Sequence, residues 1–214
     1  MNETLQACIA KYPELSACRE DIERAFQAMR DCYADGGKLL LAGNGGSAAD
    51  CEHIVGELMK GFMSKRPIPP QMREKLSQFG EAEGGYMADR LQGALPAISL
   101  VSHTAIATAY ANDVAADMVF AQQVYGYGKP GDVLIGLSTS GNSRNVIRAL
   151  QVARALGMRT IGMTGSDGGE MKRYCDVTIR APYEVTPDIQ ERHLPIYHAL
   201  CVMLERHFFG EKAG

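Results

Sequence analysis

Two segments of the sequence combine glycine with side chains that donate hydrogen bonds. Asn44-Gly45-Gly46-Ser47 follows the apolar run 38–43, and Ser138-Thr139-Ser140-Gly141-Asn142-Ser143 follows the apolar run 132–138. Glycine lets a backbone approach a ligand closely, and free N–H groups at a helix start favour phosphate. Alternatively, the serine and asparagine side chains only cap the helices that follow. Because the pattern occurs twice, we interpret both segments as phosphate-binding turns. Neither is a nucleotide-binding Walker A or G-x-G-x-x-G motif.

Side chains suited to proton transfer or metal binding lie on two predicted helices. His53 and Glu57 are four residues apart, so they share one helix face just after the first turn. Gln190 and His198 lie within about 80° of each other around the last helix, but about 12 Å apart along a straight helix axis. Pro195 removes a backbone donor between them, and we expect it to bend the helix and narrow that gap. Each residue taken alone is as compatible with packing as with function.

The elements that must position these residues alternate along the chain. Five short runs are mostly apolar, at 38–43, 96–101, 132–138, 159–164 and 176–181. Helical patterns follow them at 44–62, 103–111, 114–125, 142–156, 168–174 and 187–209. Mostly apolar strands without polar alternation, separated by helices, predict a doubly wound α/β fold with a five-stranded parallel sheet. In such a sheet, ligands bind at the carboxyl ends of the strands, where both turns lie.

Residues 1–35 are predicted to form an N-terminal helical extension, and residues 36–214 the α/β domain. Ile22, Phe26, Met29 and Tyr33 recur at the spacing of one helix face, and Pro13 interrupts a similar stripe before them. This stripe packs either on its own domain or on a partner subunit.

Residues 67–95 do not fit the alternation of strands and helices. They run from a proline-rich start through a short helical patch at 71–79 into Gly84-Gly85. The glycine-rich flank and mixed polarity indicate an insertion or a mobile flap rather than a core element.

Composition restricts the class of protein. The chain has 214 residues and a formal charge of -3, which argues against a nucleic-acid binder. No apolar run reaches the length of a membrane span, and the first residues do not form a secretory signal. The six cysteines show no C-x-x-C pair, as expected for reduced thiols. We therefore expect a cytoplasmic protein without membrane or nucleic-acid partners.

Taken together, the motifs resemble a known family. The first motifs are GNGGS and the pattern S-x-x-D-x-x-H-x-x-x-E, which contains Ser47, Asp50, His53 and Glu57. They are followed by Asn112-Asp113, by GDVLIGLSTSGNS, and by IQE with a histidine eight residues after its glutamine. In this order they resemble the phosphoheptose isomerases of the sugar isomerase (SIS) family, over about residues 20–209. STSGNS alone is typical of any SIS domain, whereas the His/Glu and Gln/His pairs are specific to the isomerases.

The resemblance implies roles for individual residues. Glu57 and His198 match the catalytic acid/base pair, and His53, Glu57, Gln190 and His198 match a site for one zinc ion per subunit. The substrate-binding positions would be Asn44, Gly45, Gly46, Ser47, Asn112, Asp113, Ser138, Thr139, Ser140, Ser143 and Gln190. The expected reaction is the conversion of sedoheptulose 7-phosphate to D-glycero-D-manno-heptose 7-phosphate through an enediol. The family resemblance also implies a homotetramer with active sites between subunits.

The sequence departs from the family pattern at several positions. Gly61 stands where many members have an arginine, which leaves Lys60, Lys65 or Arg66 to supply the charge. Asp188 replaces an arginine before Ile-Gln, and residues 67–95 are longer than the usual connection. Two alternatives therefore stay open. One is an isomerase of another sugar phosphate, and the other is a non-catalytic SIS protein of the type associated with replication initiators.

Overall fold

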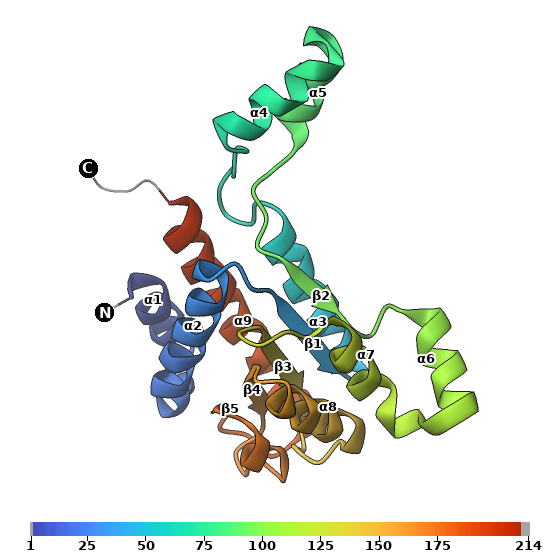
Figure 1. The fold of residues 1–214 in the computed structure, drawn as a ribbon. Coiled ribbons are helices and arrows are strands. Elements are labelled where there is room, and N and C mark those ends of the chain that lie inside the picture. The colour runs from blue at the N-terminus through green and yellow to red at the C-terminus, as the bar shows by residue number, and fades with distance from the viewer. Residues whose placement is uncertain (1, 211–214) are drawn as a thin grey trace.

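An all-parallel sheet of five strands lies at the centre of the computed structural model, which describes residues 2–210. The strands are β1 (Leu39–Gly43), β2 (Ala97–Ser99), β3 (Val133–Leu137), β4 (Arg159–Thr164) and β5 (Val177–Arg180). Their order is β2-β1-β3-β4-β5, and every neighbouring pair is parallel (Figure 1). This is the flavodoxin-like order. The predicted fold class and all five predicted strands are confirmed.

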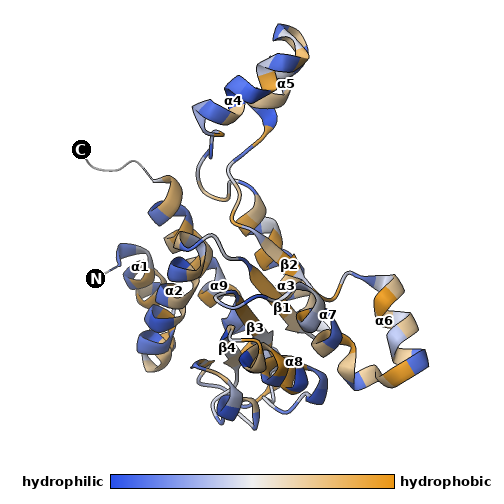
Figure 2. Cartoon of the chain, in the orientation of Figure 1, coloured by the Kyte–Doolittle hydropathy of each residue, from blue (hydrophilic) through white to orange (hydrophobic). Residues whose placement is uncertain are grey.

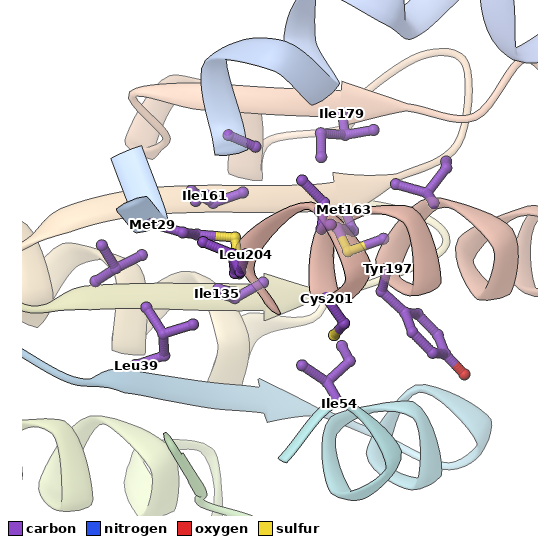
Figure 3. Packing of buried hydrophobic residues seen from close by; sticks show 14 of the residues in the cluster. Met29, Leu39, Ile54, Ile135, Ile161, Met163, Ile179, Tyr197, Cys201 and Leu204 are labelled. Atoms are coloured by element: carbon purple, nitrogen blue, oxygen red, sulfur yellow. The ribbon is translucent and has the colours of Figure 1, made fainter. Parts of the chain in front are cut away.

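Helices cover both faces of the sheet, which is why most strand positions are apolar and buried. Leu39 and Leu41 of β1 pack in one cluster with α2 (Arg19–Ala34), α3 (Gly46–Met59) and α9 (Thr186–Phe209). Leu40 and Ala42 point to the other face, toward α7 (Val119–Tyr127) and α8 (Arg144–Ala155). Figure 3 shows the first cluster, with side chains of the sheet meeting those of α9. Alternate residues of each strand therefore serve different helix layers.

The N-terminal residues form α1 (Glu3–Lys11), a 3₁₀ turn (Pro13–Cys18) and α2. Leu5, Ile22 and Met29 are fully or almost fully buried, in the same cluster as α9 and the sheet. The apolar stripe thus packs within its own chain, the first of the two alternatives left open by the sequence.

Residues 67–92 form a helical hairpin that projects from the sheet (Figure 1). It contains α4 (Pro70–Leu76), a 3₁₀ turn (Ser77–Phe79) and α5 (Glu81–Arg90). The predicted helical patch is confirmed, but the expectation of a glycine-rich flank was wrong, because Gly84 and Gly85 lie inside α5. A Cβ atom at Gly84 would lie only 2.3 Å from the Leu76 carbonyl oxygen, so glycine here allows the two helices to approach closely. Figure 2 shows α4 as largely hydrophilic.

The hairpin is closed at its base. Pro67 and Gln92 form an antiparallel bridge, and the Gly93 N–H donates to the Arg66 carbonyl at 2.7 Å. The two ends of the insertion are therefore adjacent, and the chain leaves and re-enters the α/β core at one place.

The segment between β2 and α7 is less regular than predicted. It consists of α6 (Thr104–Tyr110), a π-helical turn (Ala111–Ala115) and a 3₁₀ turn (Ala116–Met118). The predicted helix 114–125 thus begins only at Val119, and the helix predicted at 168–174 is a 3₁₀ turn (Met171–Tyr174). The last helix continues past Pro195 from Thr186 to Phe209. Within residues 2–210, no helix combines the length and the apolar character needed to cross a bilayer.

Candidate active site

The α3 helix presents His53 and Glu57 on one face, as their spacing predicts. His53 Nε2 lies 3.3 Å from Glu57 Oε1, and Lys60 Nζ lies 3.1 Å from the other carboxylate oxygen, Oε2. The Glu57 side chain is 14% exposed and that of His53 is 42% exposed. One carboxylate therefore sits between an imidazole and an ammonium group, with access to solvent.

The α9 helix brings His198 to the same place. Its Nε2 atom lies 3.4 Å from His53 Nε2, and the two rings are nearly perpendicular with centroids 5.0 Å apart. Burial, together with the charge of His53, lowers the pKa of His198 below its ordinary value, although Glu57 acts in the opposite direction. His198 is therefore neutral at pH 7, and its Nε2 atom lies within hydrogen-bond distance of His53 Nε2. The structure thus gathers His53, Glu57 and His198 from two helices.

Two further residues contact His53 from behind. The Tyr197 hydroxyl lies 3.0 Å from His53 Nδ1 and donates to Asp50 Oδ1 at 3.2 Å. Burial raises the pKa of the Asp50 carboxyl, against the hydrogen bond from Tyr197. Burial and the Asp50 charge raise the pKa of Tyr197, so its hydroxyl stays protonated. Sequence reasoning gave Tyr197 no role, since an aromatic residue on an apolar helix face is typical of a core, and Asp50 entered only as part of a motif.

The turn after β1 brings Gln190 against the start of α3. Gly45 has a φ of 56°, which favours glycine, and it precedes the first residue of the helix. A Cβ atom at Gly46 would lie 2.4 Å from Gln190 Nε2, so a larger residue here would displace that amide from its present position. Ser47, the next residue of α3, is buried. Gln190 therefore lies at the N-terminal end of α3, whereas His53 and Glu57 lie further along that helix.

The turn after β3 is held by bonds among its own residues. The Ser138 and Ser143 hydroxyl oxygens are 2.9 Å apart, and Ser140 Oγ accepts from the Asn142 N–H. A Cβ atom at Gly141, whose φ is 66°, would lie 2.4 Å from the Gly168 carbonyl oxygen. The turn is thus packed against a neighbouring loop that only glycine can approach this closely.

The two turns are joined by a pair of amides, and a pocket opens beside the second. Asn44 and Asn145 exchange two hydrogen bonds, at 3.0 and 2.8 Å. Asn145 was not singled out from the sequence, although it stands only two residues after Ser143. A pocket of about 180 Å³ is lined by Thr139, Ser140 and residues of the loop 165–168. Thr139 and Ser140 bring hydroxyl groups to this pocket, and the carboxylates of Asp167 and Glu184 also line it.

Asn112 and Asp113 are not brought to the other predicted residues. They lie exposed in the π-helical turn after α6, on the segment that extends away from the sheet in Figure 1. Their side chains bond to one another at 2.8 Å. Among the described residues, neither makes a hydrogen bond or ion pair with the residues of α3, α9 or the two turns.

The structure also sorts the three basic residues near Gly61. Arg66 is fully buried and bonds Glu205 Oε1 at 2.8 Å and the Leu58 carbonyl at 2.7 Å. It therefore faces the interior and closes the C-terminal end of α3. Lys65 is exposed. Of the three, Lys60 bonds the Glu57 carboxylate, whereas Arg66 Nη2 donates to the Glu57 backbone carbonyl oxygen at 3.1 Å. A side chain at Gly61 would meet the Ser64 carbonyl oxygen at 2.4 Å, which explains why glycine is required here.

The spacing of the ligand candidates can be compared with that of a zinc site. Two ligands about 2.0–2.1 Å from a tetrahedral ion lie about 3.3 Å apart. The pairs His53–His198 and His53–Glu57, at 3.4 and 3.3 Å, match this separation. Within residues 2–210, no three His, Cys, Asp or Glu side chains form a ready-made cluster. The pairs fit the ion, and a complete shell requires Glu57, His198 and Gln190 to approach one another.

Known proteins are similar to this chain in sequence and in fold. A family model described as SIS domain matches residues 7–93 and 77–165. The phosphoheptose isomerase of Trichlorobacter lovleyi is 42% identical over 98% of this chain and 94% of its own length. The phosphoheptose isomerase of Akkermansia muciniphila is 37% identical over 93% of this chain and 92% of its own length. The solved structure of a phosphoheptose isomerase from Neisseria gonorrhoeae has a TM-score of 0.73, with 33% identity over 95% of this chain and 93% of that one. A second solved structure, of a phosphoheptose isomerase from Francisella tularensis, has a TM-score of 0.75, with 30% identity over 92% of this chain and 91% of that one.

Proposed function

Because the chain belongs to the phosphoheptose isomerase family of SIS-domain proteins, we propose that it converts D-sedoheptulose 7-phosphate to D-glycero-D-manno-heptose 7-phosphate. The chain is a sugar phosphate isomerase, and the identity of the sugar and the chemical route are the proposal. The single observation that supports the route most strongly is the meeting of Glu57 and His198 beside His53, from two helices and distant parts of the sequence.

The phosphate is proposed to bind at the turn after β3. Ser138, Thr139, Ser140 and Ser143 provide hydroxyl groups there, and the turn opens helix α8. Asn44, Gly45, Gly46 and Ser47 line the neighbouring turn, which the Asn44–Asn145 bonds hold beside the first. The sugar then extends from the phosphate along the carboxyl edge of the sheet toward α3 and α9.

The proposed reaction moves protons between the first two carbons and their oxygens. Glu57 removes a proton from C1 of the ketose while the C2 oxygen takes up a proton, which gives the enediol. Glu57 then returns the proton to C2, and the C1 oxygen loses its proton to form the aldehyde. His198, neutral at pH 7, carries protons between the two oxygens. A carboxylate and an imidazole suffice for both steps.

Zinc is proposed as a cofactor, one ion per subunit. His53, Glu57, Gln190 and His198 would hold it, and it would polarise the carbonyl oxygen of the sugar. One carboxylate oxygen of Glu57 lies beside His53 and the other beside Lys60. One oxygen could therefore bind the ion while the other takes up a proton.

A homotetramer is proposed because two predicted substrate contacts are left without a role within one subunit. Asn112 and Asp113 are exposed on a segment that makes no bond to the rest of the site within the described residues. In a closed assembly, the same segment of a neighbouring subunit can bring these polar groups to the sugar.

The test is to incubate the purified protein with sedoheptulose 7-phosphate and to follow the products by NMR. Parallel samples contain added zinc or a chelator, and a further sample contains a six-carbon ketose phosphate. Appearance of the aldoheptose phosphate supports the proposal, and loss of turnover on chelation supports the zinc ion. Turnover of the shorter ketose alone would assign a different sugar. Binding without turnover of either ketose would indicate a regulatory SIS protein.

A further inference from the structure

We propose that Asp50 and Tyr197 form a hydrogen-bond relay that fixes the tautomer of His53. The relay holds the ring proton on Nδ1, so that Nε2 faces Glu57 and His198 with a free electron pair. Both are positioning residues, since each acts on the site only through His53. The inference rests on the proposed function in one respect, that His53 belongs to the active site.

The protons and acceptors among Asp50, Tyr197 and His53 determine this tautomer. The Tyr197 hydroxyl has one proton, and it lies 3.2 Å from Asp50 Oδ1 and 3.0 Å from His53 Nδ1. An ionised carboxylate only accepts hydrogen bonds, so the hydroxyl proton is directed to Asp50. The phenol oxygen then accepts from His53, which requires a proton on Nδ1. A neutral imidazole carries one ring proton, so Nε2 is bare.

The relay is fixed in place by the core. Tyr197 is 2% exposed, and its ring meets the His53 ring edge-on with centroids 5.4 Å apart. Figure 3 shows the ring extending from α9 among the buried side chains, with its hydroxyl at the margin of the cluster. Packing therefore sets the position of the hydroxyl, and the hydroxyl sets the proton on His53.

The consequence appears on the opposite side of the His53 ring. Nε2 lies 3.3 Å from Glu57 Oε1 and 3.4 Å from His198 Nε2. A proton on Nε2 would form a hydrogen bond to either Glu57 or His198, and that group would then no longer be free to accept another proton. With the proton on Nδ1, Nε2 can accept a proton from His198 or bind a divalent cation. Such outer partners are a general means of orienting ligand histidines.

The experiment is a ¹H–¹⁵N NMR measurement of histidine tautomers in the full-length, uniformly ¹⁵N-labelled chain with a chelator present. The chain has five histidines, and loss of one signal set in His53→Gln assigns His53. We expect the Nδ1–H form in the wild type. Tyr197→Phe keeps the ring but removes the oxygen, and should shift His53 toward the Nε2–H form.

Two variants of Asp50 extend the test. In Asp50→Ala the hydroxyl loses its acceptor and can donate to Nδ1, so His53 should again move toward Nε2–H. Asp50→Asn keeps a side-chain oxygen that can accept from Tyr197, so the Nδ1–H form should return. Both variants remove the charge of Asp50. Loss of the Nδ1–H form in Asp50→Ala and its return in Asp50→Asn would therefore be explained by the hydrogen bond from Tyr197 and not by the charge.

The matched control is Tyr33→Phe. Tyr33 is also buried, and within the described residues its hydroxyl has no hydrogen-bond partner, so the His53 spectrum should not change. An Nε2–H form in the wild type, or an unchanged spectrum in both Tyr197→Phe and Asp50→Ala, would overturn the proposal. The NMR spectra do not depend on turnover. An inactive wild type would therefore contradict the proposed function, whereas the relay would still be tested by the tautomer of His53 in these spectra.

Discussion

Glu57 is the residue on which the proposed chemistry depends most. It lies on α3 with one oxygen facing His53 and the other facing Lys60, and both contacts involve side chains rather than backbone. A change confined to this carboxylate therefore leaves the sheet and the turns after β1 and β3 in place.

Glu57→Gln should lower turnover by about 10²-fold to 10⁴-fold, because the amide keeps the shape of the side chain but is not a base. Binding of the sugar phosphate, measured by calorimetry, should change only a few-fold. Glu52→Gln is the matched control, since Glu52 is an exposed carboxylate on the same helix that bonds Ser102. Full turnover in Glu57→Gln would rule out the role assigned to this residue.

His193 provides a separate prediction on stability and pH. It is fully buried on α9, with Nε2 3.3 Å from the Thr164 carbonyl oxygen, and burial lowers its pKa to about 4 against the effect of that bond. The unfolded chain has the ordinary histidine pKa of about 6.5, so it binds more protons than the folded chain between these values. The contribution of His193 to stability is complete above about pH 6.5 and is lost as the pH falls toward 4, by up to about 3 kcal/mol.

The measurement is urea unfolding of the wild type and of His193→Gln across that range. Glutamine can still donate to Thr164 but does not titrate. The wild type should therefore lose more free energy of unfolding than the variant as the pH falls. Equal losses in the two proteins would show that His193 does not carry the effect.

At this scale the sequence predicted residues better than it predicted their contacts. The spacing of His53 and Glu57 placed them on one helix face, and the structure confirms the contact. Tyr197 and Asp50 meet through packing between α9 and α3, which no local spacing encodes. The buried Arg66–Glu205 pair joins positions that are remote in sequence, so an arginine near Gly61 looked equally suited to a substrate contact.

Among the elements, the hairpin of α4 and α5 is the one that the sequence described least well. Glycine pairs usually indicate loops, and here Gly84 serves close packing of one helix on another. The strands were predictable because burial on both faces makes most of their positions apolar. The π-helical turn at Ala111–Ala115 has no comparable signal, since its residues are exposed and of mixed type.

Replacing residues 68–91 with a short turn should leave the fold intact. Pro67 and Gln92 are already bridged, and α4 and α5 pack mainly on each other. Loop length has only a logarithmic effect on closure entropy, so the melting temperature should change by no more than about 5 °C. Circular dichroism and thermal melts test this. Loss of cooperative unfolding would show that the hairpin supports the core.

The activity of the same deletion variant then separates two roles. Retained turnover would make the hairpin an accessory to the fold. A raised KM with an unchanged melting temperature would place the hairpin near the substrate, in the same subunit or across a subunit boundary.

For the whole molecule, the open question is whether one chain builds a complete site. Asn112 and Asp113 stand apart from the other predicted residues within the described chain. If they serve a neighbouring subunit, Glu57→Gln and Asp113→Asn should each be inactive alone. Mixed by unfolding and refolding together, they should regain activity at about a quarter of the sites, since each half of a site comes from a different subunit.

Light scattering on the same samples should show the mass of a tetramer. The control is a mixture of the same two proteins without refolding, in which subunits have not exchanged. An active Asp113→Asn protein, or no recovery in assemblies of confirmed mixed composition, would contradict a shared site.

The position of β1 in the sheet has a consequence for how the chain is made. β1 is the first strand in sequence, yet it lies between β2 and β3 and pairs with both. Closing a shorter loop costs less entropy, so β3 and β4, separated by little more than α8, can pair early and locally. During synthesis, β1 is the first strand to leave the ribosome, but its second neighbour is complete only when the chain has been made as far as Leu137. The apolar residues of β1 therefore remain without their final packing partners for longer than those of the other strands.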